Sequence, residues 1–332
     1  MGDAQSHALR GATGIVIKQA FVLGAGLGTR LRSLTESLPK PLVPIFHKPL
    51  ITFAFDHLIA AGCSKLVANT HHQAGEFARA FPQSNYRDVP IVFRHEPILL
   101  ETGGGIANVA DLLGSEPFIV YNADILTDLP LEAVIAEHLR TENLVTLALR
   151  STGGPRHIAF DERSRSVIDI RNQLGSGATD EFVFTGIYVV DPKFLNRLEP
   201  GVKRSVIPTF LELIRGGKQL GGVVVDEGHW WDVGTREAYL QLHRDLPTID
   251  FPRYGAVEAN WREPVHASAI IETGAQLLGC SVVGANCRVG AGAILDDSIL
   301  WPGAQLAAQS QLRNCIVRFK KTAQGVLSDV DI

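Results

Sequence analysis

The sequence predicts an α/β domain with a mostly parallel mixed sheet, followed by a short parallel β-helix. Apolar strand-like runs alternate with helix-like segments over residues 15–248, which is typical of a sheet covered on both faces. A glycine-rich turn, from Gly24 to Gly28, follows the first of these runs. From Val265 onward, apolar residues recur at every sixth position, which is the period of a β-helix.

The elements of the α/β part are predicted from their apolar periods and their turn residues. The predicted strands span residues 15–23, 65–70, 90–96, 117–124 and 144–150, and the predicted helices span 50–62, 104–114 and 131–140. The stretch RHIAFDERSRSVIDIR (156–171) predicts a hairpin, and FVFTGIYVVD (182–191) predicts a long strand. Together they predict an antiparallel addition to the sheet that closes one side of a cleft.

The hexapeptide period predicts a β-helix whose stacked coils bury one apolar side chain per short strand. The first register contains Val265, Ile271, Leu277, Val283, Val289, Leu295 and Trp301, and a second register, one residue earlier, contains Ile294, Leu300, Leu306 and Leu312. We therefore expect an α/β domain at 15–248, a linker at 249–264, a β-helix at 265–320 and a capping tail at 321–332. We expect the β-helix to serve as a scaffold or as a contact between copies of the chain in a homo-oligomer.

Composition excludes several classes of partner. The chain has 332 residues and a formal net charge of −4, so no global positive field would recruit nucleic acid or an anionic membrane. No apolar stretch approaches the length of a membrane span, and residues 1–18 lack the apolar core of a signal peptide. The 4 cysteines lack zinc-ligand spacing, so we expect small buried thiols in a reducing compartment. These features predict a cytoplasmic protein.

The stretch VLGAGLGTRLRSLTESLPKPLVP (22–44) has the features of an anion site. It is not a dinucleotide fingerprint, because Thr29 stands where the last glycine of GxGxxG would be, and it lacks the P-loop pattern. Gly24, Gly26 and Gly28 permit a turn in which backbone N–H groups face an anion.

Two cations and a carboxylate complete this prediction. Arg30 offers a planar donor fork suited to phosphate, and Lys40 is held between two prolines. Asp124 ends a predicted strand, as the glycine turn follows another. Ligands of parallel sheets bind beyond the carboxyl ends of the strands, so we expect these residues at one binding edge.

Several motifs in order resemble those of the sugar-1-phosphate nucleotidyltransferases, the NDP-sugar pyrophosphorylases. The first is LGAGLGTRLRSLTESLPKPLVPIFHKPLI (23–51), and the others are LETGGGI (100–106), YNADILTD (121–128), FTGIYVV (184–190) and WWDVGTREAYL (230–240). The resemblance covers residues 17–245, and LETGGGI and VANTHH resemble the branch of mannose-1-phosphate guanylyltransferases and N-acetylmuramate-1-phosphate uridylyltransferases. It implies a Rossmann-like, GT-A-like catalytic domain with a left-handed β-helix behind it.

The resemblance also implies a reaction. An oxygen of a sugar 1-phosphate attacks the α-phosphorus of a nucleoside triphosphate, and pyrophosphate leaves. Arg30 would hold the triphosphate, Lys40 would contact the transferred phosphates, and Asp124 and Asp232 would hold Mg²⁺. The implied nucleotide contacts are Leu23, Gly24, Ala25, Gly26, Gly28, Thr29, Glu101 and Thr102, and the implied sugar contacts are Thr185 and Gly186.

Two points stay open at the level of sequence. A carboxylate at Glu96 or Glu101 would accept both donors of guanine, which favours GTP over UTP. The E-K-P lysine of many members is replaced here by DIRNQL (169–174), so Arg171 or Lys203 is the candidate phosphate contact and the sugar is undefined. The alternatives are a non-catalytic nucleotide-sugar sensor that acts through the β-helix, and an enzyme that also acylates.

Overall fold

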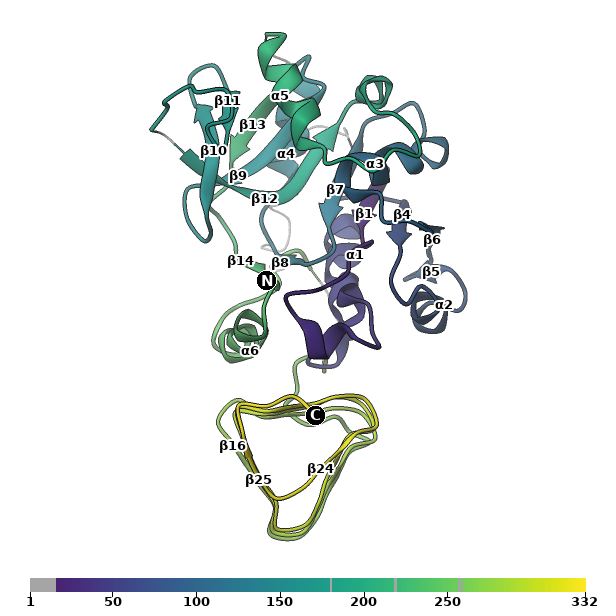
Figure 1. Ribbon diagram of the computed structural model, residues 1–332, viewed down its shortest axis with the longest axis vertical. Coiled ribbons are helices and arrows are strands. Elements are labelled where there is room, and N and C mark those ends of the chain that lie inside the picture. The colour runs from purple at the N-terminus through teal and green to yellow at the C-terminus, as the bar shows by residue number, and fades with distance from the viewer. Residues whose placement is uncertain (1–15, 180, 218–219, 256–257, 259) are drawn as a thin grey trace, which may run out of the picture.

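A computed structural model describes residues 16–179, 181–217, 220–255, 258 and 260–332. Residues 1–15 lie outside this range. They include most of the segment considered for a signal peptide and the first residue of the first predicted strand. An α/β domain and a C-terminal triangular stack of strands follow one another along the chain (Figure 1). The predicted α/β architecture is confirmed.

Among the described residues, the α/β domain contains a ten-stranded mixed sheet. Its order is β10 (Arg156–Asp161), β11 (Ser166–Ile170), β13 (Leu220–Val224), β9 (Val145–Arg150), β12 (Glu181–Val190), β7 (Phe118–Asn122), β1 (Gln19–Leu23), β4 (Lys65–Thr70), β6 (Val89–His95) and β5 (Asn85–Tyr86). Strands β7, β1, β4 and β6 are parallel neighbours, so their carboxyl ends meet at one edge. Small two-stranded sheets join β2 (Pro44–Ile45) to β3 (Lys48–Pro49) and β8 (Ile125–Thr127) to β14 (Trp230–Asp232).

Helices cover both faces of the sheet. They are α1 (Leu50–Ala60), α2 (Gly75–Ala80), α3 (Glu101–Asn108), α4 (Leu131–Arg140), α5 (Ile207–Arg215) and α6 (Arg236–Asp245). Within β1, Ala20 and Val22 point into the core shared with α1, α4 and α6, whereas Phe21 points into the core shared with α3 and α5. Helix α4 has the predicted bounds, while α3 starts three residues before the predicted 104 and ends in a 3₁₀ turn.

The predicted hairpin is confirmed, since Ile158 of β10 pairs with Ile170 of β11 in antiparallel register. The long strand β12 lies within the sheet, antiparallel to both β7 and β9. Because its run of apolar residues is buried on both faces, it serves as an inner strand with partners on two sides. The addition beyond β7 is therefore larger than expected and includes β9 and β13.

Residues 265–332 form three stacks of short parallel strands, which we call the C-terminal prism; its trace is triangular in Figure 1. The stacks are β15 (Ile270–Ile271), β18 (Arg288–Val289), β21 (Gln305–Leu306) and β24 (Thr322–Ala323); β16 (Gln276–Leu278), β19 (Ile294–Asp296), β22 (Gln311–Arg313) and β25 (Val326–Ser328); and β17 (Val282–Val283), β20 (Ile299–Leu300) and β23 (Ile316–Val317). Leu277 pairs with Leu295, and Leu295 pairs with Leu312, so the repeat shortens by one residue between coils. This shortening explains the two apolar registers of the sequence.

The prism extends beyond its expected end at residue 320. Strands β24 and β25 continue two of the stacks in parallel register, so residues expected to form a capping tail add to the ladders instead. The reason is that Ala323 and Leu327 carry on the inward apolar positions of the coils.

One stack of the prism is apolar on both faces. Val283, Leu300 and Val317 point into the prism, whereas their neighbours on the same strands pack into the core of the α/β domain. These outward residues are Val282, Ile299 and Ile316. Trp301 also packs into the α/β core, so its assignment to the inward register is wrong. The two domains are joined by burial of apolar surface.

The expected linker is part of this joint. Phe251 and Trp261, within 249–264, are buried, and both rings contact the ring of Phe53 on α1. The Trp261 carbonyl oxygen accepts a hydrogen bond from the backbone of His47. The segment therefore packs between the two domains.

Two expectations about classes of protein can be compared with the fold. In the part of the chain that the structure describes, no helix combines the length and the apolar character needed to cross a membrane. All four cysteines are free thiols, and three of them, Cys63, Cys287 and Cys315, are buried. Burial raises the pKa of Cys63 to about 12, so this thiol packs as a small apolar side chain.

We expect Trp301→Ala to lower the free energy of unfolding by about 3–5 kcal/mol, the usual cost of deleting a large buried ring. Trp301 is 1% exposed and its indole N–H donates to the Tyr239 hydroxyl, so the variant also leaves a buried polar partner. Denaturant unfolding measures the effect. Leu278→Ala, at a side chain that is 44% exposed, is the control and should change stability by less than about 0.5 kcal/mol. Equal losses of stability in the two variants would contradict the conclusion that Trp301 is part of the apolar contact between the domains.

Candidate active site

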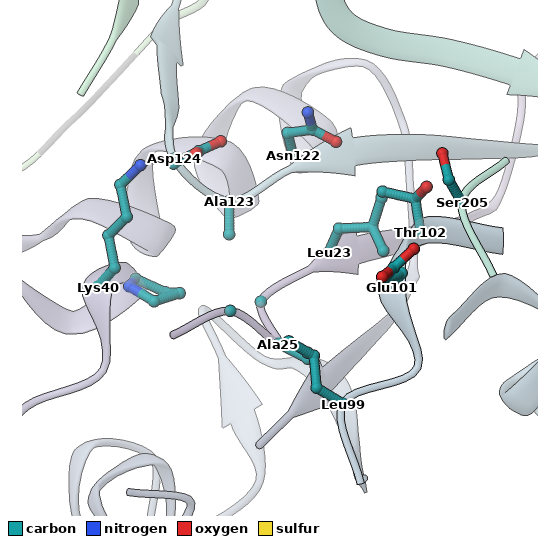
Figure 2. A pocket seen from close by; sticks show the side chains of 13 residues that line it. Leu23, Ala25, Lys40, Leu99, Glu101, Thr102, Asn122, Ala123, Asp124 and Ser205 are labelled. Carbon is teal, nitrogen blue, oxygen red and sulfur yellow. Dashed lines mark hydrogen bonds and ion pairs between the residues drawn. The ribbon is translucent and has the colours of Figure 1, made fainter. Parts of the chain in front are cut away.

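A pocket of about 370 Å³ opens at the carboxyl ends of β1 and β7. It is lined by Leu23, Gly24, Ala25, Gly26, Lys40, Pro41, Leu99, Glu101, Thr102, Asn122, Ala123, Asp124 and Ser205. Figure 2 shows Lys40 and Asp124 at one end of it and Glu101, Thr102 and Ser205 at the other. The pocket thus lies at the edge of the sheet that the sequence predicted, with its ion pair at one end.

The glycine loop is fixed at its start by Asn69, the fifth residue of β4. The side-chain oxygen of Asn69 accepts from the backbone N–H groups of Gly24, at 2.8 Å, and Ala25, at 3.1 Å. These two amides are satisfied inside the protein, so any cradle for an anion begins after them. Asn69 was not predicted from the sequence, although it lies one residue before the end of a strand beside β1 at the binding edge.

Glu96 holds Asn69 in place and does not face the pocket. It is fully buried, and one of its oxygens accepts from the Asn69 amide at 2.7 Å. The other oxygen accepts from the backbone N–H of Leu100 at 3.0 Å. Both oxygens are engaged, so the expectation that Glu96 reads a base is wrong, and Glu101 is left as the candidate carboxylate.

The far end of the glycine loop is fixed by His72. Its Nε2 donates to the Thr35 carbonyl at 2.8 Å, and the Thr35 hydroxyl donates to the Gly28 carbonyl at 2.9 Å. Gly28 has a φ of +60°, and a Cβ there would lie within 3.0 Å of the Thr35 side chain. The pair of histidines that follows β4 therefore braces loops, since His71 also bonds the Glu96 carbonyl.

The glycines of LETGGGI allow α3 to pack against the loop supports. A Cβ on Gly105 would lie 2.8 Å from the Asn69 amide nitrogen and 3.2 Å from a Glu96 oxygen. At the other side, the N–H groups of Gly103 and Gly104 donate to the Arg204 carbonyl. This close packing leaves Glu101, at the start of the helix, in the pocket wall with its side chain 44% exposed.

At its charged end the pocket is lined by one cation, Lys40, and one carboxylate, Asp124, and a second pair, Arg30 and Asp232, lies beside this end. Lys40 Nζ lies 2.6 Å from Asp124, and its side chain is only 10% exposed. Asp232 of β14 pairs in register with Ile125, which places it beside Asp124, and Arg30 lies 3.8 Å from Asp232. Burial raises the pKa of Asp232 above its ordinary value, and the charge of Asp124 raises it further. The positive charges of Lys40 and Arg30 lower this pKa, but by less.

This end of the pocket suits a divalent cation. Asp232 Oδ1 is buried and has no hydrogen-bond partner in the structure, and the neighbouring Asp124 carboxylate repels it. A hard cation would satisfy both groups. Within the described ranges no cluster of three or more His, Cys, Asp or Glu residues has the arrangement of a metal site, so further ligands would have to come from substrate phosphates or water.

Six of the expected site residues do not line the pocket. They are Gly28, Thr29, Arg30, Thr185, Gly186 and Asp232. Arg30 lies at the rim, with a side chain that is 62% exposed, and Gly186 lies against Asn122, a residue of the pocket wall. The side chain of Thr185 is fully buried and its hydroxyl donates to the Ala148 carbonyl. Because β12 is an inner strand here, this hydroxyl is not available to a sugar, and the expectation for it is corrected.

Comparisons with known proteins agree with this geometry. A family model described as "Nucleotidyl transferase" matches residues 19–248. A mannose-1-phosphate guanylyltransferase of Mycobacterium tuberculosis is 32% identical over 296 residues, which cover 87% of this chain and 81% of that protein. An N-acetylmuramate alpha-1-phosphate uridylyltransferase of Neisseria meningitidis is 30% identical over 219 residues, covering 65% and 93%. The crystal structure of HddC from Yersinia pseudotuberculosis, 21% identical, shares the fold with a TM-score of 0.55 over 68% of this chain and 98% of that one.

We expect Asp232→Asn to stabilise the ligand-free protein at pH 7. A carboxyl with a raised pKa favours the folded state while it is protonated, and that contribution is lost as the pH rises through its folded pKa. The gain should stay below about 1 kcal/mol, because the side chain is 40% exposed, and should vanish as the pH falls toward about 4. Thermal unfolding at both pH values measures it. Asp124→Asn is the control and should destabilise, since it breaks the ion pair with Lys40; a destabilised Asp232→Asn would contradict the argument.

Proposed function

The chain belongs to the nucleotidyl transferase family, and on that premise we propose that it transfers a nucleoside monophosphate from a nucleoside triphosphate to a sugar 1-phosphate. A phosphate oxygen of the sugar 1-phosphate forms a bond to the α-phosphorus, and the bond from this phosphorus to the pyrophosphate oxygen breaks. The products are an NDP-sugar and pyrophosphate. The observation that carries the proposal is the Lys40–Asp124 pair, with Asp232 beside it, at one end of a pocket whose floor is a fixed glycine loop.

The chain has no need of a general base for this step, because the attacking phosphate oxygen is already an anion. Catalysis then consists of positioning the two substrates in line and of balancing the charge that moves to the leaving group. Lys40 is held in a 3₁₀ turn between prolines and is nearly buried, so its charge is aimed before the substrate arrives. Arg30, at the exposed rim, would bind the outer phosphates of the triphosphate.

Mg²⁺ fits the pair formed by Asp124 and Asp232. When bound there, the ion supplies positive charge that offsets the phosphates around the scissile bond. Asp124 and Asp232 would hold it, with phosphate oxygens as further ligands. In the ligand-free protein, Lys40 balances part of the charge of Asp124. The same lysine is free to turn to a phosphate once that carboxylate has another cation.

The opposite end of the pocket suits a nucleobase. Glu101 lines it with a half-exposed carboxylate, and its backbone φ is +61°, a conformation that is uncommon outside glycine. Two carboxylate oxygens match the adjacent N1–H and N2–H₂ donors of guanine. Uracil presents one N–H between two carbonyl acceptors that would repel a carboxylate. We therefore propose GTP as the preferred nucleotide over UTP.

Of the two candidates for the role of the E-K-P lysine, Lys203 lies at the Glu101 end of the pocket, opposite Lys40 and Asp124. In DIRNQL, Asp169 is fully buried and its carboxylate accepts backbone N–H bonds from Leu174 and Ser176, so this stretch caps a loop. Lys203 lies 3.8 Å from Glu101, on the segment that also brings Ser205 into the pocket wall. The sugar, of the mannose type or an amino sugar, stays a prediction, as do the cytoplasmic location and the homo-oligomer.

The prism is proposed to be a left-handed β-helix. Its triangular outline, its three parallel stacks and the spacing between paired strands, which is 17 or 18 residues and shortens to 15 between β22 and β25, support this interpretation. No observation favours an acyltransferase role for it.

We expect Lys40→Ala to lower kcat about 100-fold to 1,000-fold, the usual loss when one preorganised charge is removed from a transition state. Pyrophosphate release with Mg²⁺ should be measured across GTP, UTP, dTTP, CTP and ATP against a panel of sugar 1-phosphates. Lys193→Ala, at an exposed lysine outside the pocket, is the matched control and should retain full activity. The opposite result is a wild-type protein that releases no pyrophosphate with any pair of substrates and still binds a nucleotide sugar tightly. That result would contradict the proposed enzyme activity and would support a nucleotide-sugar sensor.

We expect Glu101→Gln to lower kcat/KM for GTP about 10-fold to 100-fold and to leave the value for UTP nearly unchanged. A carboxamide accepts only one of the two guanine bonds and sets an N–H₂ group against the other donor. Glu142→Gln is the control, since Glu142 is exposed and precedes β9 at the opposite edge of the sheet. An unchanged ratio of GTP to UTP activity would show that backbone groups read the base.

A further inference from the structure

Asp331 of the prism bonds two segments of the α/β domain at once. One of its oxygens accepts from the Ser33 hydroxyl at 2.6 Å, and the other accepts from Arg236 Nε at 2.8 Å. Both partners follow expected site residues closely in sequence, because Ser33 lies three residues after Arg30 and Arg236 lies four residues after Asp232. The Asp331 and Arg236 side chains are only 10% and 19% exposed, so solvent screens this contact weakly.

A second prism residue holds the same segment. The Arg318 guanidinium, 18% exposed, donates to the Ser33 carbonyl and lies 2.7 Å from the Glu36 carboxylate. The backbone of Asp331 is itself part of the prism, through a parallel bridge to Ile316. The loop that contains Arg30 therefore rests on two side chains with fixed supports.

The segment that contains Lys40 is tied to the prism by a third route. Trp301 Nε1 donates to the Tyr239 hydroxyl at 2.9 Å, and this hydroxyl donates to the Pro44 carbonyl at 2.7 Å. All three residues of this relay lie at the joint between the domains, and Pro44 follows Lys40 by four residues. Three of the four chain segments that bring charge to the phosphate end of the pocket, those of Arg30, Lys40 and Asp232, thus have a polar bond to the prism, directly or through one residue.

Direct contact between the charges does little to fix their spacing. Arg30 and Asp232 lie 3.8 Å apart with side chains that are 62% and 40% exposed, and an exposed pair of this kind is weak. The guanidinium of Arg30 rests on Gly234, where an added Cβ would lie 2.8 Å from Arg30 Nη1. Asp331 bonds both segments through a carboxylate whose side chain is only 10% exposed.

We propose that Asp331 is a positioning residue for phosphate binding, because it holds the Arg30 segment and the Asp232 segment in register with each other. The inference rests on the proposed nucleotidyl transfer. Transfer between two phosphates depends on fixed charges, and a displacement of about 1 Å costs up to about 100-fold in rate. Asp331 touches no pocket residue and acts through Ser33 and Arg236. The prism is in this view part of the support of the active site.

The test compares Asp331→Ala, Asp331→Asn, Ser33→Ala and the double variant Ser33→Ala/Asp331→Ala. We expect Asp331→Ala to lower kcat/KM for the nucleoside triphosphate about 10-fold, with KM for the sugar 1-phosphate unchanged, because Arg30 is proposed to bind the outer phosphates of the triphosphate. Asp331→Asn retains one acceptor and should recover part of the loss. The double variant should be no less active than Asp331→Ala alone, because the Ser33–Asp331 bond that Ser33→Ala removes is already lost in Asp331→Ala.

Glu272→Ala is the matched control. The Glu272 carboxylate bonds only prism groups, Arg288 and the N–H of Ala291, and its loss should leave the kinetics unchanged. Should Asp331→Ala fail to fold, Asp331→Asn and Ser33→Ala give the same comparison.

Two outcomes would overturn the inference. One is unchanged kinetics in Asp331→Ala and Ser33→Ala. The other is an equal loss of kcat/KM for both substrates together with a lower melting temperature, which marks a structural contact. Calorimetry of GTP and UTP binding in the presence of Mg²⁺ measures triphosphate affinity without turnover, so it distinguishes either of these outcomes from a failure of the proposed function. A wild-type protein without transfer activity refutes the proposed function, whereas the Asp331 variants still report on the inference through triphosphate affinity.

Discussion

The site depends on one buried contact, the acceptance of two loop amides by the side-chain oxygen of Asn69. This contact joins the end of β4 to the loop that follows β1, and Glu96 fixes the amide from the other side. A buried carboxylate and a buried carboxamide are tolerable because all the atoms involved have partners. The packing in turn requires a residue without a Cβ at Gly105. A glycine-rich helix, a polar strand end and a glycine loop therefore form a single rigid floor.

The charges above this floor are balanced in a way that suits anionic substrates. Two carboxylates and two cations lie in or beside one end of the pocket, and among these four Lys40 and Asp124 form the close pair. Asp232 keeps a buried oxygen without a hydrogen bond, and its pKa is raised by burial and by Asp124. Such a group is costly for the ligand-free fold and is typical of a site built for a cation and phosphate. Stability and function therefore place opposite demands on this residue.

The joint between the two domains is both apolar and directional. The stack of β17, β20 and β23 is apolar on both of its faces, one toward the prism and one toward the α/β core. Burial of Val282, Ile299 and Ile316 holds the domains together. Hydrogen bonds that Asp331 accepts and that Arg318 and Trp301 donate fix their orientation. These polar bonds reach chain segments next to the phosphate end of the pocket. A domain that looks like an appendage in sequence is thus adjacent to the elements of the candidate site.

The α/β class, the bounds of α4 and the periodic apolar residues of the prism could be predicted from local periods, and Gly24, Gly26, Lys40 and Asp124 from motifs near strand ends. The resemblance to a family added Leu23, Ala25, Glu101 and Thr102 to the predicted pocket wall. Tertiary packing was needed to show that Glu96 supports Asn69, that Thr185 is buried in an inner strand, that Trp301 faces the other domain and that Asp331 meets Ser33. A period reports which residues share a face, but not which element covers that face. Residues 33 and 331 come together only when the strands stack, and no local pattern records a contact across that length of chain.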